Sequence, residues 1–482
     1  MEPLPVDLLA QAVGGRLMSG NPRTVVRGVS TDSRTLAPGD LFVPLKGERF
    51  DGHDFVPDAL ARGAAATFWQ EGRPFPVRGG ASAAAGGRGA VPGGAAVIAV
   101  DDPLAALHRL AKWQRSRLGA RVVAVTGSNG KTTTKDMAAA VLSVRWSMAK
   151  SAGNYNNEVG LPLAVLAAPR GTQVLVLEMA MRGPGQIRQL AEIARPDVGI
   201  VTNVGPVHLE LLGSIENIAK AKQELVEALP EDGWAVLNAD DPLVRAMAGA
   251  ARSRTIFYGC GPEADVQASA VVSRGLEGIE FTLHWQGQRR RISVPAPGRH
   301  NVYNALAAAG AALALGLTLD EVAWGLAAYS KHASAMRMEL RVRSDGVRVI
   351  NDAYNASPAS MAAALELLRE LDGGRRVAIL GDMLELGPLS EAAHREVGRV
   401  AAATGVDQLA AVGRWSGTMA AAAVEAGLAP ERVATFPDAA AAAAWAKGFV
   451  RPGDVVLVKA SRGLRLERVA AALLEGQGGE SA

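Results

Sequence analysis

A glycine-bracketed turn at residues 126–133, Thr-Gly-Ser-Asn-Gly-Lys-Thr-Thr, carries residue types suited to binding phosphate. Glycines let backbone N–H groups converge on an anion, and a helix that begins after the turn adds its positive dipole end. Lys131 would reach the outer phosphates of a nucleotide, and the Thr132 hydroxyl would bind Mg²⁺. The strict P-loop pattern has a glycine where this chain has Val125, so the turn is a variant. Its strand-like and helix-forming flanks favour nucleotide binding over a plain turn with a solvated lysine.

Two side chains that could bind a metal follow apolar runs that we expect to be strands. Glu178 ends the run Val-Leu-Val-Leu-Glu, where a carboxylate can bind Mg²⁺ through oxygen. Apolar residues follow Glu178, which favours this role over that of a solvated acid at a strand end. His208 follows a Thr-Asn-Val-Gly-Pro-Val turn. The sequence favours neither of two roles for this histidine, that of a metal ligand and that of an ordinary packed or exposed residue. Open α/β sheets bind their ligands at the ends of such strands.

Polar segments elsewhere could bind substrates or could only shape turns. Asn154, Asn156 and Asn157 lie in a loop rich in amides and glycines, which fits substrate binding but also the satisfaction of turn backbone. Segment 351–358 places a carboxylate, a phenol and amides in one turn, which favours binding over a simple helix cap. Segment 298–304 opens a predicted helix with polar donors.

Two lysines, Lys220 and Lys222, lie within one predicted helix. Because they are two positions apart, they point to different faces of that helix. Ordinary chemistry would leave both solvated, and the residues alone do not distinguish them.

The composition indicates a cytoplasmic protein of several domains. Its 482 residues are too many for one core, and this length suggests about three domains. Basic and acidic residues nearly balance at a formal charge of +3, which gives no reason to invoke nucleic acid or a membrane anchor. Cys260 is the only cysteine, which excludes an intramolecular disulfide and fits a reducing compartment. We expect neither a signal peptide nor a membrane-spanning helix.

The apolar pattern predicts two sheets that could position the polar residues. Continuous short apolar runs that alternate with helical segments are typical of a parallel sheet covered on both faces. The first sheet is expected to contain strands at 122–125, 174–177, 198–201, 235–237 and 255–258, followed by an antiparallel addition within 265–297 and a helix from about Asn301. The second is expected to contain strands at 347–350, 377–380, 409–412, 433–436 and 455–458. The glycine- and alanine-rich stretch 79–94 has little to bury and predicts a disordered surface loop.

Taken together, these motifs resemble those of the Mur ligases, in the family's order and over essentially the whole chain. The matching stretches are Thr126–Thr133, Asn154–Asn157, Leu177–Glu178, Asn203–His208, Ala221–Glu224, Gly298–Asn301 and Asn351–Met361. Stretches 30–34, 44–47 and 51–53 also look like the family's UDP-sugar-binding domain. The resemblance implies an α/β fold of three domains. These are a small UDP-substrate domain at 1–104, a central P-loop ATPase-type parallel sheet at 105–330, and a Rossmann-like domain for an incoming dipeptide at 331–482.

Within the family, segment 352–358, Asp-Ala-Tyr-Asn-Ala-Ser-Pro, is most similar to members that add D-alanyl-D-alanine to UDP-N-acetylmuramoyl-tripeptide. Ligases that add the third residue typically have an Asp-Tyr-Ala-His type sequence there, and folylpolyglutamate synthetases a Gly-Ala-His-Asn type. The implied reaction uses ATP to convert the tripeptide's carboxylate into an acyl phosphate, which the dipeptide amine attacks to give the pentapeptide precursor of peptidoglycan. Another ligase of this superfamily is the near alternative, and a nucleotide-gated regulatory ATPase without ligation is the distant one.

The resemblance also implies roles for individual residues. The implied catalytic residues are Lys131, Lys222, His208 and Glu178. Two Mg²⁺ ions are implied, with Thr132, Glu178, His208 and a carbamylated Lys222 on the metal side. The implied ATP-binding residues are Gly127, Ser128, Asn129, Gly130, Lys131, Thr132, Thr133, His300, Asn301, Asn304, Arg337 and Asp352. The implied substrate-binding residues are Ser30, Asp32, Ser33, Arg34, Lys46, Asn154, Asn156, Asn157, Tyr354, Asn355 and Ser357.

Two positions depart from the family pattern. Ser357 stands where the family usually has asparagine, and Ala460 stands where it usually has glycine. Either could shift the preference for the dipeptide, while the phosphate-binding residues are unaffected. The implied protein is a monomer.

Overall fold

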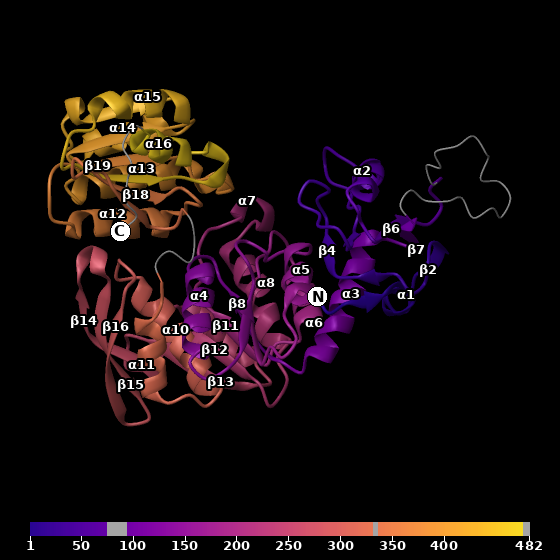
Figure 1. Cartoon of the computed structure of the whole chain (residues 1–482). Coiled ribbons are helices and arrows are strands. Elements are labelled where there is room, and N and C mark those ends of the chain that lie inside the picture. The colour runs from indigo at the N-terminus through magenta and orange to yellow at the C-terminus, as the bar shows by residue number, and fades with distance from the viewer. Residues whose placement is uncertain (75–93, 331–335, 476–482) are drawn as a thin grey trace.

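The computed structural model describes residues 1–74, 94–330 and 336–475, which form three successive α/β units. Figure 1 shows the N-terminal unit at one end of the molecule, the central unit beside it, and the C-terminal unit packed on the far part of the central one. Apart from Gly94, the stretch predicted to be a disordered loop lies outside the described residues. Within the described ranges, no helix combines the length and the apolar character needed to cross a membrane.

The N-terminal unit contains a five-stranded sheet with the order β2-β7-β6-β5-β4, parallel except where β2 meets β7. Strand β7 reads Ala-Val-Ile-Ala-Val and is buried throughout, as expected for an apolar run in the middle of a covered sheet. The elements are β1 (Leu4–Pro5), α1 (Val6–Val13), β2 (Arg16–Ser19), β3 (Val25–Val26), β4 (Gly28–Ser30), β5 (Asp40–Phe42), α2 (Val56–Ala61), β6 (Ala66–Gln70) and β7 (Ala96–Val100).

The central unit is built on a nine-stranded sheet with the order β16-β15-β14-β13-β12-β11-β8-β10-β9. Strands β8 to β14 pair in parallel, and β14, β15 and β16 form an antiparallel addition. The strands are β8 (Arg121–Thr126), β9 (Met148–Lys150), β10 (Val174–Glu178), β11 (Val198–Val201), β12 (Trp234–Asn238), β13 (Arg254–Gly259), β14 (Val266–Ser273), β15 (Ile279–Trp285) and β16 (Gln288–Val294). The helices are α4 (Lys131–Leu142), α5 (Gly160–Ala167), α6 (Gln186–Ala194), α7 (Leu209–Leu212), α8 (Ile215–Glu227), α9 (Pro242–Ala246), α10 (Asn301–Ala314) and α11 (Leu319–Ala327).

The C-terminal unit has a six-stranded sheet with the order β17-β18-β22-β19-β20-β21, parallel except where β17 meets β18. Its strands are β17 (Glu339–Val342), β18 (Arg348–Asp352), β19 (Arg376–Gly381), β20 (Gln408–Val412), β21 (Val433–Phe436) and β22 (Val455–Lys459). Its helices are α12 (Pro358–Glu370), α13 (Ser390–Ala403), α14 (Ser416–Glu425), α15 (Ala439–Phe449) and α16 (Glu467–Leu474).

The predicted α/β fold with two parallel sheets is confirmed, including the antiparallel strands between residues 265 and 297. Two short edge strands were not predicted, β9 and β17. Both lack a fully buried residue, so neither produces the continuous apolar run by which the interior strands were found.

Helix α3 (Pro103–Leu118) connects the first two units. It begins at Pro103, after Asp102 accepts a hydrogen bond from the Ala105 N–H at 2.7 Å, and it ends at Gly119 in a left-handed conformation. Leu107 and Leu110 of this helix belong to one hydrophobic cluster that also contains residues of α1, β7, β8 and α8. The predicted boundary at residue 104 therefore lies in the first turn of a helix that packs on both sides, and the domain limits stay a prediction.

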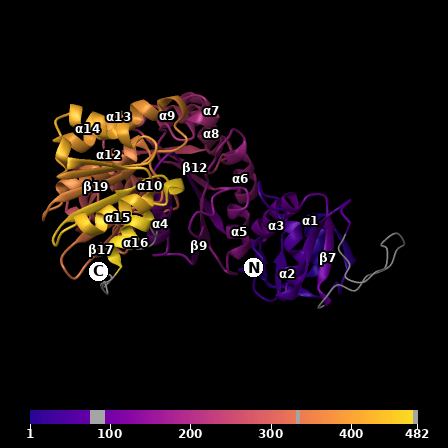
Figure 2. The ribbon, with the colours of Figure 1, turned by 90° about the horizontal axis from the view of Figure 1, so that it is seen from above.

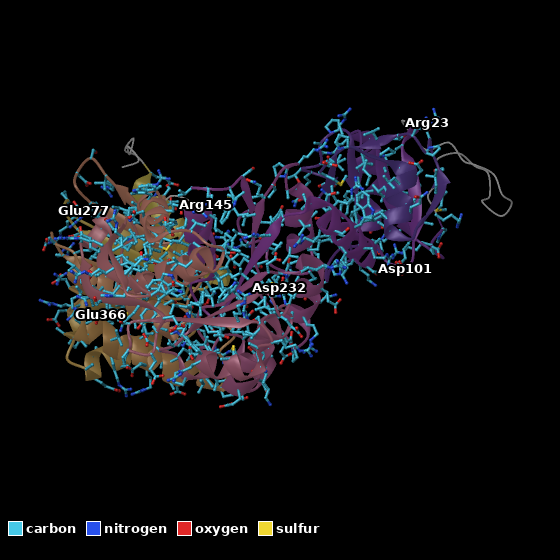
Figure 3. All side chains as sticks on the ribbon, turned by 90° about the horizontal axis from the view of Figure 1, so that it is seen from below. Arg23, Asp101, Arg145, Asp232, Glu277 and Glu366 are labelled. Atoms are coloured by element: carbon cyan, nitrogen blue, oxygen red, sulfur yellow. The ribbon has the colours of Figure 1, made fainter. Side chains whose placement is uncertain are left out.

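Two further views show how the units and their charges are arranged. Seen from above, the C-terminal unit lies against the central one while the N-terminal unit projects from the other side (Figure 2). Charged side chains of both signs cover the outside, with Arg23 and Asp101 on the N-terminal unit and Glu277 and Glu366 toward the opposite end (Figure 3). This mixture of signs agrees with a formal charge of only +3.

Candidate active site

The glycine-bracketed turn connects β8 to α4, as the sequence predicted. Gly130 precedes the first residue of α4 with φ at 82°, a left-handed conformation that glycine adopts without strain. A Cβ on Gly127 would lie 1.8 Å from Thr202 Oγ1, and one on Gly130 would lie 2.3 Å from Asn304 Oδ1. A side chain at either position would therefore crowd its neighbour, and the backbone N–H groups at the start of α4 lie at a helix N-terminus suited to phosphate.

The turn after β11 holds the glycine-bracketed turn in place. The Asn129 N–H donates to Asn203 Oδ1 at 2.9 Å, and the Ser128 N–H donates to the Asn203 carbonyl at 2.9 Å. Thr202 Oγ1 donates to the Asn129 carbonyl at 2.6 Å, and Gly205 N–H donates to Ser128 Oγ at 2.8 Å. These contacts fix the loop conformation through a segment more than seventy residues away in sequence.

Glu178 lies at the end of β10, beside the first turn of α4, and is almost completely buried at 1% exposure. Thr132 Oγ1 donates to its Oε2 at 2.8 Å, and Asn156 Nδ2 donates to its Oε1 at 2.8 Å. A hydroxyl and a carboxylate oxygen at contact distance are the ligand types that Mg²⁺ prefers. This donor set fits a Mg²⁺ ion, and Asn156 is the asparagine of its loop that reaches the carboxylate.

The buried lysine of α8 is Lys222, which is 2% exposed, whereas Lys220 is exposed. The structure thus distinguishes the surroundings of two lysines that the sequence leaves alike. Burial holds the pKa of Lys222 well below its ordinary value, and the nearby charge of Lys131 lowers that pKa further. Among the described residues, no hydrogen-bond or ion-pair partner of its amine was found. A neutral, unpaired amine is the form that can react with CO₂.

Lys131 lies among the other candidate catalytic residues. Its ammonium donates to the carbonyls of Gly127 at 2.7 Å and Ser128 at 3.1 Å, within its own loop. Burial lowers the pKa of Lys131, and the carboxylate of Glu178 opposes that change. Because Lys131 also lowers the pKa of both His208 and Lys222, the four predicted catalytic residues lie within electrostatic range of one centre.

His208 follows β11 and makes a contact that the sequence did not predict. Its Nδ1 hydrogen-bonds to the carboxylate of Glu385, a residue of the C-terminal unit. Burial lowers the pKa of His208, and the charge and hydrogen bond of Glu385 oppose this shift. His208 is therefore neither a packed core residue nor a free surface histidine, since it bridges two units of the fold.

A pocket of about 460 Å³ lies between the glycine-bracketed turn and the C-terminal unit. Its C-terminal wall contains the predicted residues Arg337, Asp352, Tyr354 and Asn355. The Arg337 guanidinium stacks 4.2 Å from the centre of the Tyr354 ring. Asp352 accepts a hydrogen bond from Lys459 Nζ at 2.5 Å, which fixes its carboxylate at the rim. The predicted ATP-side residues of two units therefore face the same cavity.

The opposite wall of this pocket comes from α10. It is lined by Asn301 and Asn304 of this helix and by His300, the residue just before it. Asn304 Nδ2 donates to Asn301 Oδ1 at 2.8 Å, and Asn304 Oδ1 accepts from Thr134 at 3.2 Å, so these amides fix α10 against α4. The same end of the pocket contains Tyr303, whose hydroxyl donates to Asp240 Oδ2 at 2.9 Å.

Cys260 lies beside that end of the pocket. Its backbone N–H donates to Asp240 Oδ2 at 2.6 Å, the oxygen that also accepts from Tyr303. The residue is exposed, and partial desolvation raises the pKa of its thiol. The thiol is thus accessible but not activated.

The two departures from the family pattern lie close to the pocket in different ways. Ser357 caps α12, and its hydroxyl donates to Asn129 Oδ1 in the glycine-bracketed turn at 2.9 Å. This bond connects the C-terminal unit directly to the predicted phosphate loop. Ala460 is fully buried after β22, where its methyl packs beside Gly381. The smaller Ser357 side chain thus contacts a residue of the predicted phosphate loop, while Ala460 belongs to the supporting core.

The predicted substrate residues of the N-terminal unit do not line this pocket. Asp32 accepts from the Arg34 backbone N–H and guanidinium, which lowers the pKa of Asp32 to about 2. Ser30 Oγ donates to the Asp32 carbonyl at 2.9 Å, while Ser33 is buried and Lys46 is exposed. Ser30, Asp32 and Arg34 thus form a compact polar turn within the N-terminal unit.

The remaining asparagines of the predicted substrate loop have different surroundings. Asn154 is exposed, and Asn157 Oδ1 accepts from the Gly160 N–H at 2.9 Å at the start of α5. Lys135, which is 1% exposed, supports this loop by donating to the carbonyls of Ser151 at 3.0 Å and Gly153 at 3.4 Å. Lys135, Lys459 and Glu385 were missed by sequence reasoning, because their partners lie in other segments of the chain.

Comparison with known proteins places the chain in a family. The model of the Mur ligase middle domain matches residues 125–312, that of the Mur ligase glutamate ligase domain matches 336–462, and that of the Mur ligase family catalytic domain matches 25–115. The chain belongs to the Mur ligase family, and the resemblance seen in its motifs is confirmed. Among individual relatives, it is 42% identical over 474 residues to the UDP-N-acetylmuramoyl-tripeptide–D-alanyl-D-alanine ligase of Bacillus subtilis, covering 98% of each chain. The enzyme of the same name from Mycobacterium tuberculosis is 40% identical over 98% of each chain.

Solved structures give the same result. A crystal structure of MurF from Acinetobacter baumannii matches with a TM-score of 0.85 and 31% identity, covering 98% of this chain and 99% of that one. MurF ligase from Thermotoga maritima, crystallised in complex with ADP, matches with a TM-score of 0.76 and 31% identity, covering 93% and 97%. A UDP-N-acetylmuramoyl-L-alanyl-D-glutamate–2,6-diaminopimelate ligase is only 19% identical, at a TM-score of 0.51, and shares the fold alone.

Proposed function

We propose that this chain is the ligase that joins D-alanyl-D-alanine to UDP-N-acetylmuramoyl-tripeptide at the expense of ATP. The observation that carries the proposal is the pocket in which the glycine-bracketed turn faces Arg337, Asp352 and Tyr354 of the C-terminal unit. Relatives with this enzyme's name match over 98% of the chain at 40–42% identity, which supports the same activity here. The product would be the UDP-linked pentapeptide precursor of peptidoglycan.

The reaction needs ATP because a carboxylate has no good leaving group for attack by an amine. Transfer of the γ-phosphoryl group to the tripeptide's terminal carboxylate gives an acyl phosphate, and the dipeptide amine then attacks the acyl carbon as phosphate leaves. Negative charge accumulates on the transferring group, so catalysis depends mainly on positioned positive groups. Residues 127–133 at the start of α4 would bind the phosphates through backbone N–H groups and the ammonium of Lys131.

The donor set beside Lys131 would hold Mg²⁺. Thr132 and Glu178 supply oxygens that already lie 2.8 Å apart, and His208 is the third predicted ligand. Lys222 would contribute as a carbamate, since carbamylation turns its buried neutral amine into a carboxylate. When bound, Mg²⁺ would neutralise charge on the phosphates. The involvement of two ions rests on the family resemblance.

The remaining substrates would come from the outer units. Tyr354, Asn355 and Ser357 would border the incoming dipeptide, and the polar turn around Asp32 would bind the UDP-sugar end of the tripeptide substrate. Ser357 already contacts the phosphate loop through Asn129, so the dipeptide side and the ATP side are adjacent. Closure of the outer units over the pocket would exclude water from the acyl phosphate. A cytoplasmic location and a monomeric state stay predictions.

Mass spectrometry of the products tests the proposal. The full chain is incubated with ATP, Mg²⁺, UDP-N-acetylmuramoyl-tripeptide and D-alanyl-D-alanine, and we expect a new amide product together with ADP and phosphate. Two parallel reactions use other substrate pairs. One contains UDP-N-acetylmuramoyl-dipeptide and a single amino acid, and the other contains a folate and glutamate. A product in either parallel reaction, and none from the tripeptide substrate, would show that the chain is a different ligase of this superfamily. Phosphate release without any acceptor and without a new amide would favour a regulatory ATPase.

A further inference from the structure

The contact between His208 and Glu385 joins two residues with an uncommon backbone conformation. His208 has φ at 56° and Glu385 has φ at 63°, both in the left-handed region that residues other than glycine seldom adopt. His208 belongs to the central unit and Glu385 to the C-terminal unit, and 177 residues separate them. The Glu210 N–H also donates to the Glu385 carbonyl at 3.4 Å, so the backbone of the same two segments is in contact.

The segment that carries Glu385 is fixed on both sides. The Met383 N–H donates to Nε2 of the fully buried His394 at 2.9 Å, and the Leu384 N–H donates to Ser461 Oγ at 3.0 Å. Leu386, which is 1% exposed, anchors the other side in the C-terminal core. The turn therefore presents Glu385 from a rigid support, rather than from a loose loop that happens to lie nearby.

The bond leaves the second nitrogen of the imidazole available. Glu385 contacts Nδ1 of His208, and among the described residues no hydrogen-bond partner of its Nε2 was found. A carboxylate that accepts from one ring N–H fixes the tautomer and the ring orientation, and it makes the other nitrogen a better ligand. Metal-binding histidines almost always have such a partner.

We propose that Glu385 is a positioning residue that the C-terminal unit supplies to the metal-binding His208 of the central unit. The inference rests on the metal role of His208 in the proposed function. It adds that the metal site is complete only when the C-terminal unit is docked. Metal binding and docking of that unit would then strengthen each other by the same factor, since coupling between two equilibria is reciprocal.

Binding of Mn²⁺ to the full chain tests this proposal without relying on turnover. The free-ion electron paramagnetic resonance signal gives the dissociation constant, at saturating ADP, for the unaltered chain and for Glu385→Ala, His208→Ala and the double variant. We expect Glu385→Ala to weaken Mn²⁺ binding by about tenfold to a hundredfold, the usual effect of losing such a partner. In the His208→Ala background, Glu385→Ala should add almost nothing, because the residue acts through the imidazole.

Two further variants separate positioning from other effects. Glu385→Gln should recover part of the affinity, because its amide oxygen can accept the same hydrogen bond. Glu210→Ala removes an exposed carboxylate from the neighbouring helix α7 and should leave Mn²⁺ affinity unchanged, which excludes a general loss of negative charge. Melting temperatures confirm that each variant is folded.

The possible results distinguish this inference from the function on which it rests. If Glu385→Ala binds Mn²⁺ normally while His208→Ala does not, the positioning role is wrong and the metal role of His208 stands. If His208→Ala itself binds Mn²⁺ normally, the metal assignment fails and the role of Glu385 fails with it. Equal weakening by Glu210→Ala and Glu385→Ala would also overturn the proposal in favour of unspecific electrostatics.

Discussion

At the scale of single residues, burial distinguishes side chains that the sequence treats alike. Lys220 and Lys222 have the same chemistry and lie in the same helix, but only Lys222 is enclosed by protein. A buried lysine without a partner loses its charge, because desolvation disfavours the ammonium form. A neutral amine of this kind at the proposed metal-binding centre would supply no negative charge unless it is modified.

Replacement of Lys222 tests its proposed carbamylation. We expect Lys222→Ala to lower the ligation rate by about a hundredfold or more, the scale seen when a group that stabilises transition-state charge is removed. Formate or acetate should restore part of the rate by supplying the missing oxygens in the vacated space. Steady-state phosphate release measures both effects.

Lys220→Ala is the matched control for this experiment, because Lys220 is exposed on the same helix. It should keep its activity and show no response to added acid. Full activity of Lys222→Ala in the absence of any carboxylic acid would contradict the carbamate role.

Residues of the candidate site could be predicted from the sequence where one short motif contains both the functional side chain and the strand or helix that carries it. Lys131 and Thr132 follow a strand within one short motif, and Glu178 is the last residue of a strand, so the sequence alone indicates the elements that carry them. Glu385 and Lys459 could not be found in this way. Their partners, His208 and Asp352, are 177 and 107 residues away, and only the fold brings them together.

At the scale of elements, the interior strands were predictable because both faces of each sheet are covered. Strand β8 is buried from Val122 to Thr126 and so reads as a continuous apolar run. Strand β9 has three residues and none is buried, so nothing in its sequence separates it from a loop. Contacts between helices were harder to predict from the sequence than strands. Helices α13 and α14, for example, pack closely only because Gly398 has no side chain.

A pair of glycine substitutions tests this fit. A Cβ on Gly398 of α13 would lie 2.2 Å from the Met419 carbonyl of α14, so Gly398→Ala should destabilise the C-terminal unit by about 1–3 kcal/mol through overpacking. Gly417 of α14 has open space around it, and Gly417→Ala should stabilise by up to about 1 kcal/mol through backbone entropy. Urea unfolding followed by circular dichroism measures both changes. If both substitutions lowered the free energy of unfolding equally, close packing at Gly398 would not explain its effect.

At the scale of the whole molecule, the hydrophobic clusters do not follow the three sheets. One cluster extends from α1 through α3 to α8, so it joins part of the N-terminal core to half of the central one, while a smaller cluster lies within the N-terminal unit alone. The clusters around β19 and β22 are formed almost entirely by the C-terminal unit. We therefore expect the first two units to unfold together and the third to unfold separately.

Differential scanning calorimetry can detect these two transitions. Leu110→Ala in α3 removes a fully buried side chain from the shared cluster and should lower the transition of the first two units, at a cost of about 2–5 kcal/mol. Leu457→Ala in β22 should lower the other transition by a similar free energy. A single transition that both substitutions shift equally would show instead that the whole chain unfolds as one cooperative body.

Cys260 provides a single site for attaching a fluorescent label. As the chain's only cysteine, and an exposed one, it would accept one maleimide fluorophore at one position. The dye would sit beside Asp240 and Tyr303, which line the pocket near α10. Since the pKa of this thiol is raised, labelling would proceed best in mildly alkaline buffer. A second dye on the C-terminal unit would then report the distance between the two units in real time, with no native cysteine to remove first.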